Sequence, residues 1–205
     1  PAVVGTVQEQ AKEFVDQGKS VEDFVEEAEG LATRLGKVKL KTGGQYFSTK
    51  GTSTYWDPFD VSVGRNNYDI TSAKLAVSGT GDAISVLKEA AKDKTNRPED
   101  LKKINSSLKD GFIDYFMADE IPSIVKAAKK LKFDGLKIME SDDVSDPSSV
   151  VLWNTKKAKK ISLSQLFKAP SVEYQDVIVS KKQGEPSRYF IYKYGGRTKG
   201  EVSKN

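Results

Sequence analysis

The sequence predicts an α+β protein: a small mixed or antiparallel sheet core flanked by helices, with an N-terminal helical hairpin and a C-terminal β-hairpin. Two long stretches place apolar residues at helical spacing, whereas several short runs alternate apolar and polar residues as half-buried strands do. Glycine-containing turns separate these stretches. With 205 residues, 37% of them hydrophobic, the chain is long enough for one good core but short for two full domains.

The first 36 residues are predicted to form a helical extension. Residues 6–17 and 20–35 show helical spacing, and Gly18-Lys19 separates them. Ser20 is suited to cap the second helix, because Asp23 follows three residues later. Gly36 is expected to end it.

Residues 37–170 are predicted to form the main α+β domain. Lys37 to Lys41 alternates lysines with apolar residues, which indicates a half-exposed edge strand, and Gln45 to Thr49 indicates a second strand. Asp60 to Val63 and Ile70 to Ser78 are expected as further strands. A loop from Gly64 to Asp69 is expected to join them.

The second half of this domain alternates helices and strands. Helices are expected at 82–92, 98–110 and 119–131, and strands at Phe133 to Met139 and Ser149 to Trp153.

The end of the chain is predicted to be a basic hairpin and tail covering 171–205. Its strands are expected at Val172 to Ser180 and Arg188 to Tyr194. Just before it, Ile161 to Phe167 fits a strand and a short helix equally well, because periodicity does not separate the two at that length.

Composition excludes several kinds of site. The chain has no cysteine and no histidine. Disulfides, thiolate metal sites and catalytic triads with histidine are therefore excluded, so any catalysis uses carboxylates, hydroxyls, Lys or Arg. The sequence also lacks an apolar run of transmembrane length and a visible signal peptide. The expected location is the cytoplasm of a host cell or a virion, with no membrane partner.

Positive charge is concentrated near the C-terminus. Residues 154–205 hold twelve Lys or Arg against four Asp or Glu, whereas residues 1–153 hold 21 against 25. A basic segment attracts nucleic acid non-specifically through its phosphates, and simple solvation explains it equally well. The candidate nucleic-acid-binding residues are Lys156, Lys157, Lys159, Lys160, Arg188 and Lys193.

The connection between the strands at 133–139 and 149–153 is acidic, with Glu140, Asp142, Asp143 and Asp146. On residue chemistry alone a solvated loop is the favoured interpretation, since neighbouring carboxylates repel one another. A hard cation such as Mg²⁺ is the remote alternative, and no metal site is predicted, because the calcium-loop pattern is missing.

The same stretch resembles a known family. Phe-Asp-Gly-Leu-Lys-Ile at 133–138, the acidic loop, and Ser-Ser-Val-Val-Leu-Trp-Asn at 148–154 are similar to the C-terminal half of ADP-ribosyltransferase-like domains in phage and mobile-element polyvalent proteins. There a Tyr-Asp-Gly-Ile strand precedes an acidic loop and a Ser-Tyr-Val-Val-Phe strand. Tyr-Phe-Ser at 46–48 matches a further family element. The resemblance covers the middle of the chain and fades towards both ends.

This resemblance implies transfer of ADP-ribose from NAD to a protein or nucleic-acid target, with Glu140 as the catalytic carboxylate. Tyr46 and Tyr55 are then candidate nicotinamide-stacking rings, with Ser48 and Ser72 as polar partners. From residue chemistry, the aromatic residues fit a small core better than a ring-binding site. Arg65, in an expected loop, is a candidate phosphate contact, although a surface arginine is the simpler interpretation.

The sequence departs from the family pattern in two places. A motif beginning with histidine is impossible here, and Glu140-Ser141-Asp142 replaces the Glu-x-Glu of another subclass. An active transferase and a catalytically degraded one therefore both remain open. The alternative function is a non-enzymatic protein, virion-associated or nucleic-acid-binding, that uses the basic C-terminal segment.

Overall fold

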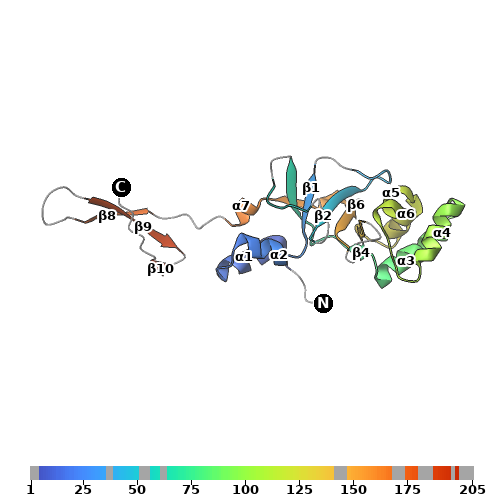
Figure 1. The fold of residues 1–205 in the computed structure, drawn as a ribbon, viewed down its shortest axis with the longest axis horizontal. Helices are drawn as coiled ribbons and strands as arrows, with labels where there is room; N and C mark the ends of the chain where they lie inside the picture. Colours follow the sequence, from blue (N-terminus) through green and yellow to red (C-terminus); the bar gives the residue numbers. More distant parts are fainter. Residues whose placement is uncertain are drawn as a thin grey trace. The chain divides into compact units, whose positions relative to one another are not determined.

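The computed structural model describes residues 5–35, 39–50, 56–60, 64–140 and 147–167, and the backbone of three further strands between 174 and 198. The chain divides into two compact units, residues 1–166 and 167–205. The described residues form an α+β protein with a seven-stranded mixed sheet and seven α-helices. The predicted α+β class and the N-terminal helices are thus confirmed, and the sheet is larger than expected. Figure 1 shows α3 to α6 gathered at one end of the first unit.

Two short helices begin the chain. The α1 helix (Val7–Asp16) and the α2 helix (Val21–Glu27) each start with a capping box, formed by Thr6 with Glu9 and by Ser20 with Asp23. The predicted cap at Ser20 is therefore confirmed.

The predicted continuation of the second helix to residue 35 is wrong. Ala28 leaves the helical conformation with ψ 128°, and Gly30 turns the chain with φ 73°. Leu31–Leu35 then forms strand β1 in the main sheet.

The main sheet runs in the order β4-β5-β6-β2-β1-β3-β7, and every neighbouring pair except β4 and β5 is antiparallel. Apart from β1, its strands are β2 (Gln45–Thr49), β3 (Arg65–Asp69), β4 (Leu75–Val77), β5 (Gly135–Ile138), β6 (Ser149–Leu152) and β7 (Lys159–Ile161).

Three strand predictions are confirmed, one predicted loop is a strand, and one predicted strand is too long, while the strands predicted at Lys37 to Lys41 and Asp60 to Val63 lie partly outside the described residues. The strands expected around 45–49, 133–139 and 149–153 are β2, β5 and β6. The segment expected as a loop, Gly64 to Asp69, contains strand β3, and the strand expected from Ile70 is shorter and begins at Leu75. Polar residues form β3 because it pairs on both sides, with β1 and with β7, so its neighbours override its weak strand propensity.

Four helices lie between β4 and β5: α3 (Gly81–Ala90), α4 (Pro98–Ser107), α5 (Tyr115–Glu120) and α6 (Pro122–Lys130). The helix predicted at 119–131 is α6, which begins three residues later, and the short helix α5 before it was not predicted. Ile121 is non-helical, and Pro122 starts α6, as proline favours a first helical position. The ambiguous stretch at 161–167 contains the end of β7 and the short helix α7 (Leu163–Leu166).

The sheet is covered on both faces. On one face Leu136, Ile138 and Val151 pack with apolar residues of α3, α4, α5 and α6. On the other, Phe47 and Val150 belong to a smaller cluster with Ala32, Ile70 and Leu152. Because successive side chains of a strand point to opposite faces, Tyr46 and Ser48 lie on the helix-covered face, and Phe47 and Thr49 on the opposite one.

The Asp-Gly pair before β5 joins three segments. The amide of Asp134 donates to the Lys74 carbonyl oxygen at 2.7 Å, and its carboxylate accepts the Lys74 amide at 3.0 Å and the Asn154 side-chain amide at 2.7 Å. The motif that carries the family resemblance thus has a structural role: it aligns the starts of β4 and β5 with the end of β6.

Replacing Asp134 with asparagine is expected to reduce the dependence of stability on acid pH. The pKa of Asp134 is lowered chiefly by the Lys74 amide, against desolvation, and further by Asn154. A carboxyl with a lowered folded-state pKa stabilises fully above its ordinary pKa of about 4, and this contribution is lost as pH falls through the lowered value. Urea unfolding should therefore show that wild type has a higher free energy of unfolding than Asp134→Asn at pH 6, and that this difference is smaller at pH 3. An equal advantage at both pH values would contradict this.

The second unit contains β8 (Tyr174–Val179), β9 (Ser187–Tyr194) and β10 (Arg197–Thr198). The β8 and β9 strands pair antiparallel, with Tyr174 opposite Tyr192 and Val179 opposite Ser187. These are the two stretches in which the sequence predicts a hairpin.

Candidate functional site

A hydroxyl-carboxylate cluster lies where β2, β5 and β6 meet. The Tyr46 hydroxyl donates to Oε1 of Glu140 at 2.6 Å, and the Ser149 hydroxyl donates to the same oxygen at 2.8 Å. The Tyr46 and Ser149 hydroxyls are 2.5 Å apart. Glu140 lies two residues after the end of β5 and is half-buried. Two predicted site residues, Tyr46 and Glu140, are therefore brought into contact, and one oxygen of Glu140 is held by two donors.

Tyr46 remains a hydrogen-bond donor at neutral pH. Burial raises the pKa of its hydroxyl well above the ordinary value, and the hydrogen bond to Glu140 raises it further. Its ring packs edge-on against Tyr115, with 5.8 Å between the centroids. The geometry thus gives Tyr46 a role in orienting Glu140, while its predicted stacking on nicotinamide stays a prediction.

A row of buried polar side chains leads across the sheet to this cluster. Asn67, Thr33, Ser48 and Ser149 lie opposite one another on β3, β1, β2 and β6. None is more than 7% exposed. Ser48 also hydrogen-bonds the Tyr46 hydroxyl. The predicted partner Ser48 is therefore close to Glu140, and the buried Oδ1 of Asn67, without a hydrogen-bond partner, marks the far end of the row.

Arg65 lies in strand β3 and not in the predicted loop. Its side chain is only 10% exposed, and Nη1 lies 3.6 Å from a carboxylate oxygen of Asp57 and 3.4 Å from one of Asp60. Two carboxylates already compensate this guanidinium, so they would compete with a phosphate. A phosphate contact by Arg65 stays a prediction.

Among the described residues, Ser72 is not part of the cluster around Glu140. Ser72 is exposed, and its hydroxyl donates to the Lys157 carbonyl oxygen at 3.4 Å. Tyr55 and the acidic residues Asp142, Asp143 and Asp146 lie outside the described residues.

The basic residues before the hairpin lie in a turn and an edge strand. Lys156 and Lys157 belong to a 3₁₀ turn (Thr155–Lys157), and Lys159 and Lys160 are exposed on β7 at the edge of the sheet. Arg188 and Lys193 belong to β9.

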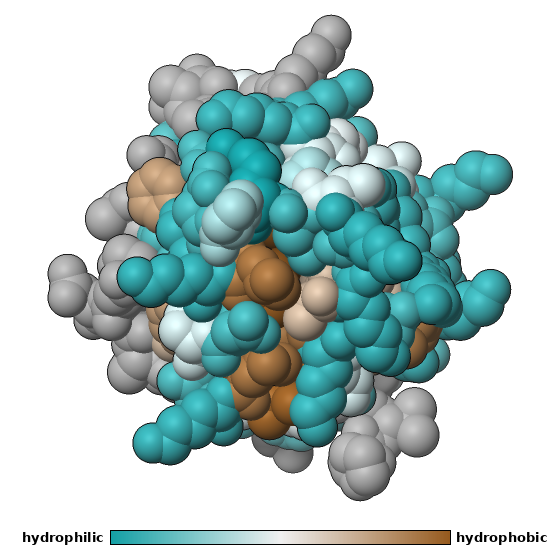
Figure 2. All heavy atoms as spheres, turned by 90° about the vertical axis from the view of Figure 1, so that its right-hand side faces the viewer, coloured by the Kyte–Doolittle hydropathy of each residue, from teal (hydrophilic) through white to brown (hydrophobic). Residues whose placement is uncertain are grey.

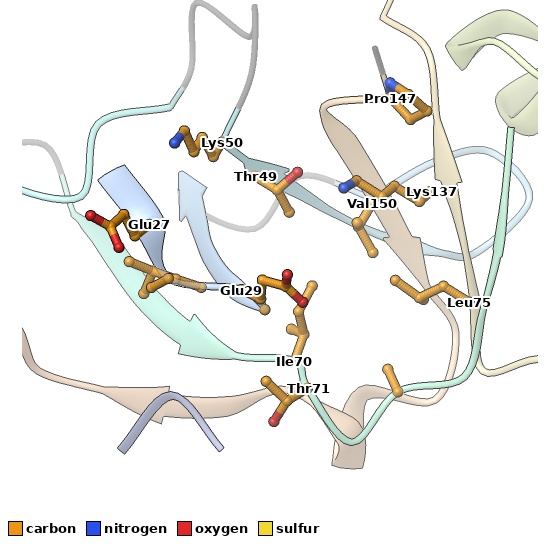
Figure 3. A pocket seen from close by; sticks show the side chains of 14 residues that line it. Glu27, Glu29, Thr49, Lys50, Ile70, Thr71, Leu75, Lys137, Pro147 and Val150 are labelled. Atoms are coloured by element: carbon orange, nitrogen blue, oxygen red, sulfur yellow. The ribbon is translucent and has the colours of Figure 1, made fainter. Parts of the chain in front are cut away.

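A hollow among the described residues lies on the face of the sheet opposite the Tyr46 hydroxyl. It has a volume of about 790 Å³, and Ile70, Leu75 and Val150 supply apolar lining. Figure 3 shows Lys50 and Lys137 on the side of β2 and β5, and Glu27 and Glu29 on the side of α2 and β1. Of the described cofactor candidates Tyr46, Ser48, Arg65 and Ser72, none lines it, although Thr49 comes from the strand that carries Ser48 and Lys137 from the strand before Glu140.

The sequence prediction missed Ser149 and Tyr115. Ser149 is part of the strand motif that carries the resemblance, but its contact with Glu140 depends on pairing between β5 and β6. Tyr115 comes to lie beside Tyr46 because Asp114 pairs with Met139, which follows β5.

The comparisons with known proteins add no relative. No protein-family model, curated protein or solved structure matches this chain. Within the described residues, no group of three or more acidic side chains could hold a metal ion, and no helix there is long and apolar enough to cross a membrane.

Proposed function

We propose that the chain is an ADP-ribosyltransferase-like protein that uses Glu140 to transfer ADP-ribose from NAD to a protein or nucleic-acid target. The observation that carries this proposal is the cluster at Glu140, where Tyr46 and Ser149 both donate to one carboxylate oxygen. The two donors hold this carboxylate in one orientation. A carboxylate that stabilises positive charge developing on a substrate has to be held in place in this way. The resemblance of residues 133–138 and 148–154 to this family supports the same residue.

Transfer of ADP-ribose from NAD requires one well-placed carboxylate. When the bond between nicotinamide and ribose breaks, positive charge develops on the ribose ring, and a fixed negative charge stabilises it. The leaving group is nicotinamide, and the target nucleophile forms the new bond to the ribose carbon and loses its proton. Tyr46 and Ser149 act as positioning residues because they hold Glu140 and need not touch NAD.

The 790 Å³ hollow lies on the opposite face of the sheet from the Tyr46–Glu140 cluster, so the reacting end of NAD is not placed in it. Its volume falls within the range of ordinary ligand pockets. Lys50 and Lys137 carry positive charge on the side nearer β5, whereas Glu27 and Glu29 oppose binding of a diphosphate there. The predicted contacts of Tyr55, Arg65 and Ser72 with NAD remain part of the proposal.

The test is NAD binding by calorimetry together with nicotinamide release, with wild type beside Glu140→Gln. Turnover by wild type that is lost in the variant would support an active transferase. Binding without turnover in wild type would support the degraded form. Absence of both would refute the use of NAD.

A second candidate function is non-specific binding of nucleic acid or of a virion component. The observation that favours it is the exposure of Lys156, Lys159 and Lys160 around an edge strand. Exposed lysines reach phosphates without rearrangement of the fold, and each contact releases counterions from the nucleic acid.

Replacing Lys156, Lys159 and Lys160 with glutamine is expected to weaken single-stranded DNA binding and to reduce its salt dependence. Each lost phosphate contact lowers the slope of log affinity against log salt by about 0.7 for a single strand. Fluorescence anisotropy between 50 and 200 mM salt measures this slope. The matched control replaces the exposed Lys102, Lys103 and Lys109 of the α4 region. Equal effects in both variants would show that only net charge matters.

A further inference from the structure

Three segments that are distant in the chain meet just before the start of β5. The Trp153 indole nitrogen, which follows β6, donates to the Phe133 carbonyl oxygen at 2.9 Å. The Asp134 amide donates to the carbonyl oxygen of Lys74, which precedes β4, at 2.7 Å. The meeting point is named the Trp153 corner, and it consists of Lys74, Lys129, Lys132, Phe133, Asp134, Trp153, Asn154 and Lys157.

Four lysines belong to this corner. The Lys129 amino group lies 5.7 Å from the centroid of the Trp153 ring, and the Lys74 amino group lies 4.7 Å from that of the Phe133 ring. Lys74, Lys129 and Lys132 are exposed, and Lys157 is half-buried. Among the described residues, none of the four forms an ion pair.

Asp134 is the carboxylate of the corner, and its oxygens are already bonded. They accept the Lys74 amide at 3.0 Å and the Asn154 side-chain amide at 2.7 Å. The pKa of Asp134 is lowered chiefly by the Lys74 amide, and the nearby charges of Lys157 and Lys74 lower it further. Four lysines and one carboxylate leave the corner with a net positive charge.

Carboxylates beside the corner do not cancel this charge. Glu89 pairs with Lys92 and Lys130, and Asp93 pairs with Lys126. These two carboxylates are therefore matched by three lysines that the corner does not include. Glu140 follows the opposite end of β5.

Lys132 occupies a backbone conformation that favours glycine. Its φ is 65°, and no other non-glycine residue in the described part of the chain has a positive φ. The Lys132 amide donates to the Lys129 carbonyl oxygen and the Phe133 amide to that of Ala128, both at 3.0 Å, so the turn ends α6 in the way that glycine usually does. A side chain there costs free energy, which motivates a role for the charge that it carries.

The surface beside the corner suits a polar partner. Figure 2 shows the side on which α3 to α6 lie, where hydrophilic side chains surround a narrow apolar strip. Lysine in the last turn of a helix complements the helix dipole, which explains Lys129. It does not explain Lys74 and Lys157, because these come from outside α6.

We propose that the Trp153 corner binds a single-stranded nucleic acid, with phosphates at its lysines and one base stacked on the Trp153 ring. Positive charge around an accessible aromatic ring is the combination that binds single strands without sequence preference, and Trp153 is half-exposed. No described carboxylate holds Lys129 above the ring, so its amino group can turn to a phosphate and leave the ring face to a base. This surface differs from the β7 lysines of the second candidate function and does not require the transferase function.

The lysines are tested by fluorescence anisotropy of a short labelled oligothymidylate with the full chain between 50 and 200 mM salt. Replacing Lys74, Lys129 and Lys132 with glutamine should lower the slope of log affinity against log salt by about 2, because each lost phosphate contact lowers it by about 0.7. The matched control is the α4-region variant described above, which changes the net charge equally. Thermal unfolding checks that each variant is folded.

Lys132→Gly separates binding from folding. Glycine adopts the positive φ without strain, so the unfolding temperature of this variant should equal or exceed that of wild type. Its affinity for the oligothymidylate at 50 mM salt should nevertheless fall about two- to fivefold, as loss of one phosphate contact implies.

Stacking is tested by comparing Trp153→Phe with Trp153→Leu. Both variants lose the hydrogen bond to Phe133, but only the first keeps a ring. Trp153→Leu should therefore bind about five- to a hundredfold more weakly than Trp153→Phe. In the Trp56→Phe chain, where Trp153 is the remaining tryptophan, the oligothymidylate should quench the fluorescence and an oligoglutamate peptide should not.

The proposal is overturned if wild type does not bind the oligothymidylate, if the three lysines matter no more than the control, or if Trp153→Leu and Trp153→Phe bind equally. Equal binding of oligoglutamate would assign the corner to an acidic peptide and would also overturn it. Loss of binding only in the variant of Lys156, Lys159 and Lys160 would leave the second candidate function standing without the Trp153 corner. Glu140→Gln should bind the oligothymidylate as wild type does, so failure of the transferase proposal does not affect this result.

Discussion

Glu140→Gln is expected to abolish nicotinamide release while leaving the fold intact. Glutamine has nearly the same shape, and its carbonyl oxygen can still accept the Tyr46 and Ser149 hydroxyls, which now hold the Glu140 carboxylate at 2.6 and 2.8 Å. What disappears is the negative charge. Removing one preorganised electrostatic group from an active site lowers turnover about a hundred- to a thousandfold.

The measurement is nicotinamide release at saturating NAD, with thermal unfolding of the same samples. Glu13→Gln is the matched control, because Glu13 is an exposed carboxylate on α1. Tyr46→Phe gives a graded comparison: the charge stays, but one of the two donors that fix it is lost. Its effect on turnover should lie between those of the other two variants. Turnover in Glu140→Gln equal to that of wild type would remove Glu140 from the catalytic role.

Sequence patterns predict the structure correctly where an element depends on residues that are close to one another in the chain. The cap at Ser20, the proline start of α4 and the apolar strands around residues 135 and 150 follow from short-range spacing. The second helix was overextended because Ala28 and Ala32 fit helical spacing. Gly30, with φ 73° and its carbonyl oxygen bonded by the Ile70 amide, was the missed stop signal.

Elements that depend on distant partners were not predictable from composition. Arg65 to Asp69 is polar and resembles a loop in sequence, yet it forms β3 between two other strands. Likewise, the basic run before Ile161 ends in edge strand β7. Strand propensity is weak compared with pairing, so single-sequence patterns miss such strands.

The candidate site was predictable in part for the same reason. Tyr46, Ser48 and Glu140 were singled out from short motifs, and the sheet brings these three together. No sequence pattern indicates that Asp57 and Asp60 compensate the charge of Arg65, because those contacts require the segment around Pro58 to lie against β3. Pairwise contacts of this kind are set by the tertiary structure.

Gly135→Ala is expected to destabilise the protein more than any surface change discussed above. A Cβ at this position would lie 2.5 Å from the Val151 carbonyl oxygen and 2.5 Å from Cδ2 of Leu152. The carbonyl belongs to strand β6, which pairs with both β5 and β2, so it cannot move without disturbing the sheet. Overpacking against a fixed backbone costs about 3 kcal/mol in the free energy of unfolding.

Urea unfolding of Gly135→Ala measures this cost, with Gly81→Ala as the matched control. Gly81 begins α3, and an added Cβ there meets no atom within 4 Å, so that variant should be neutral or slightly more stable. Equal midpoints for the two variants would contradict the close approach of β5 and β6. A large loss only in Gly135→Ala would give the glycine of the Asp-Gly motif a steric explanation that holds whether or not the chain binds NAD. The Asp-Gly motif would then stabilise the sheet directly, and it would affect the position of Glu140 only because the sheet positions that residue.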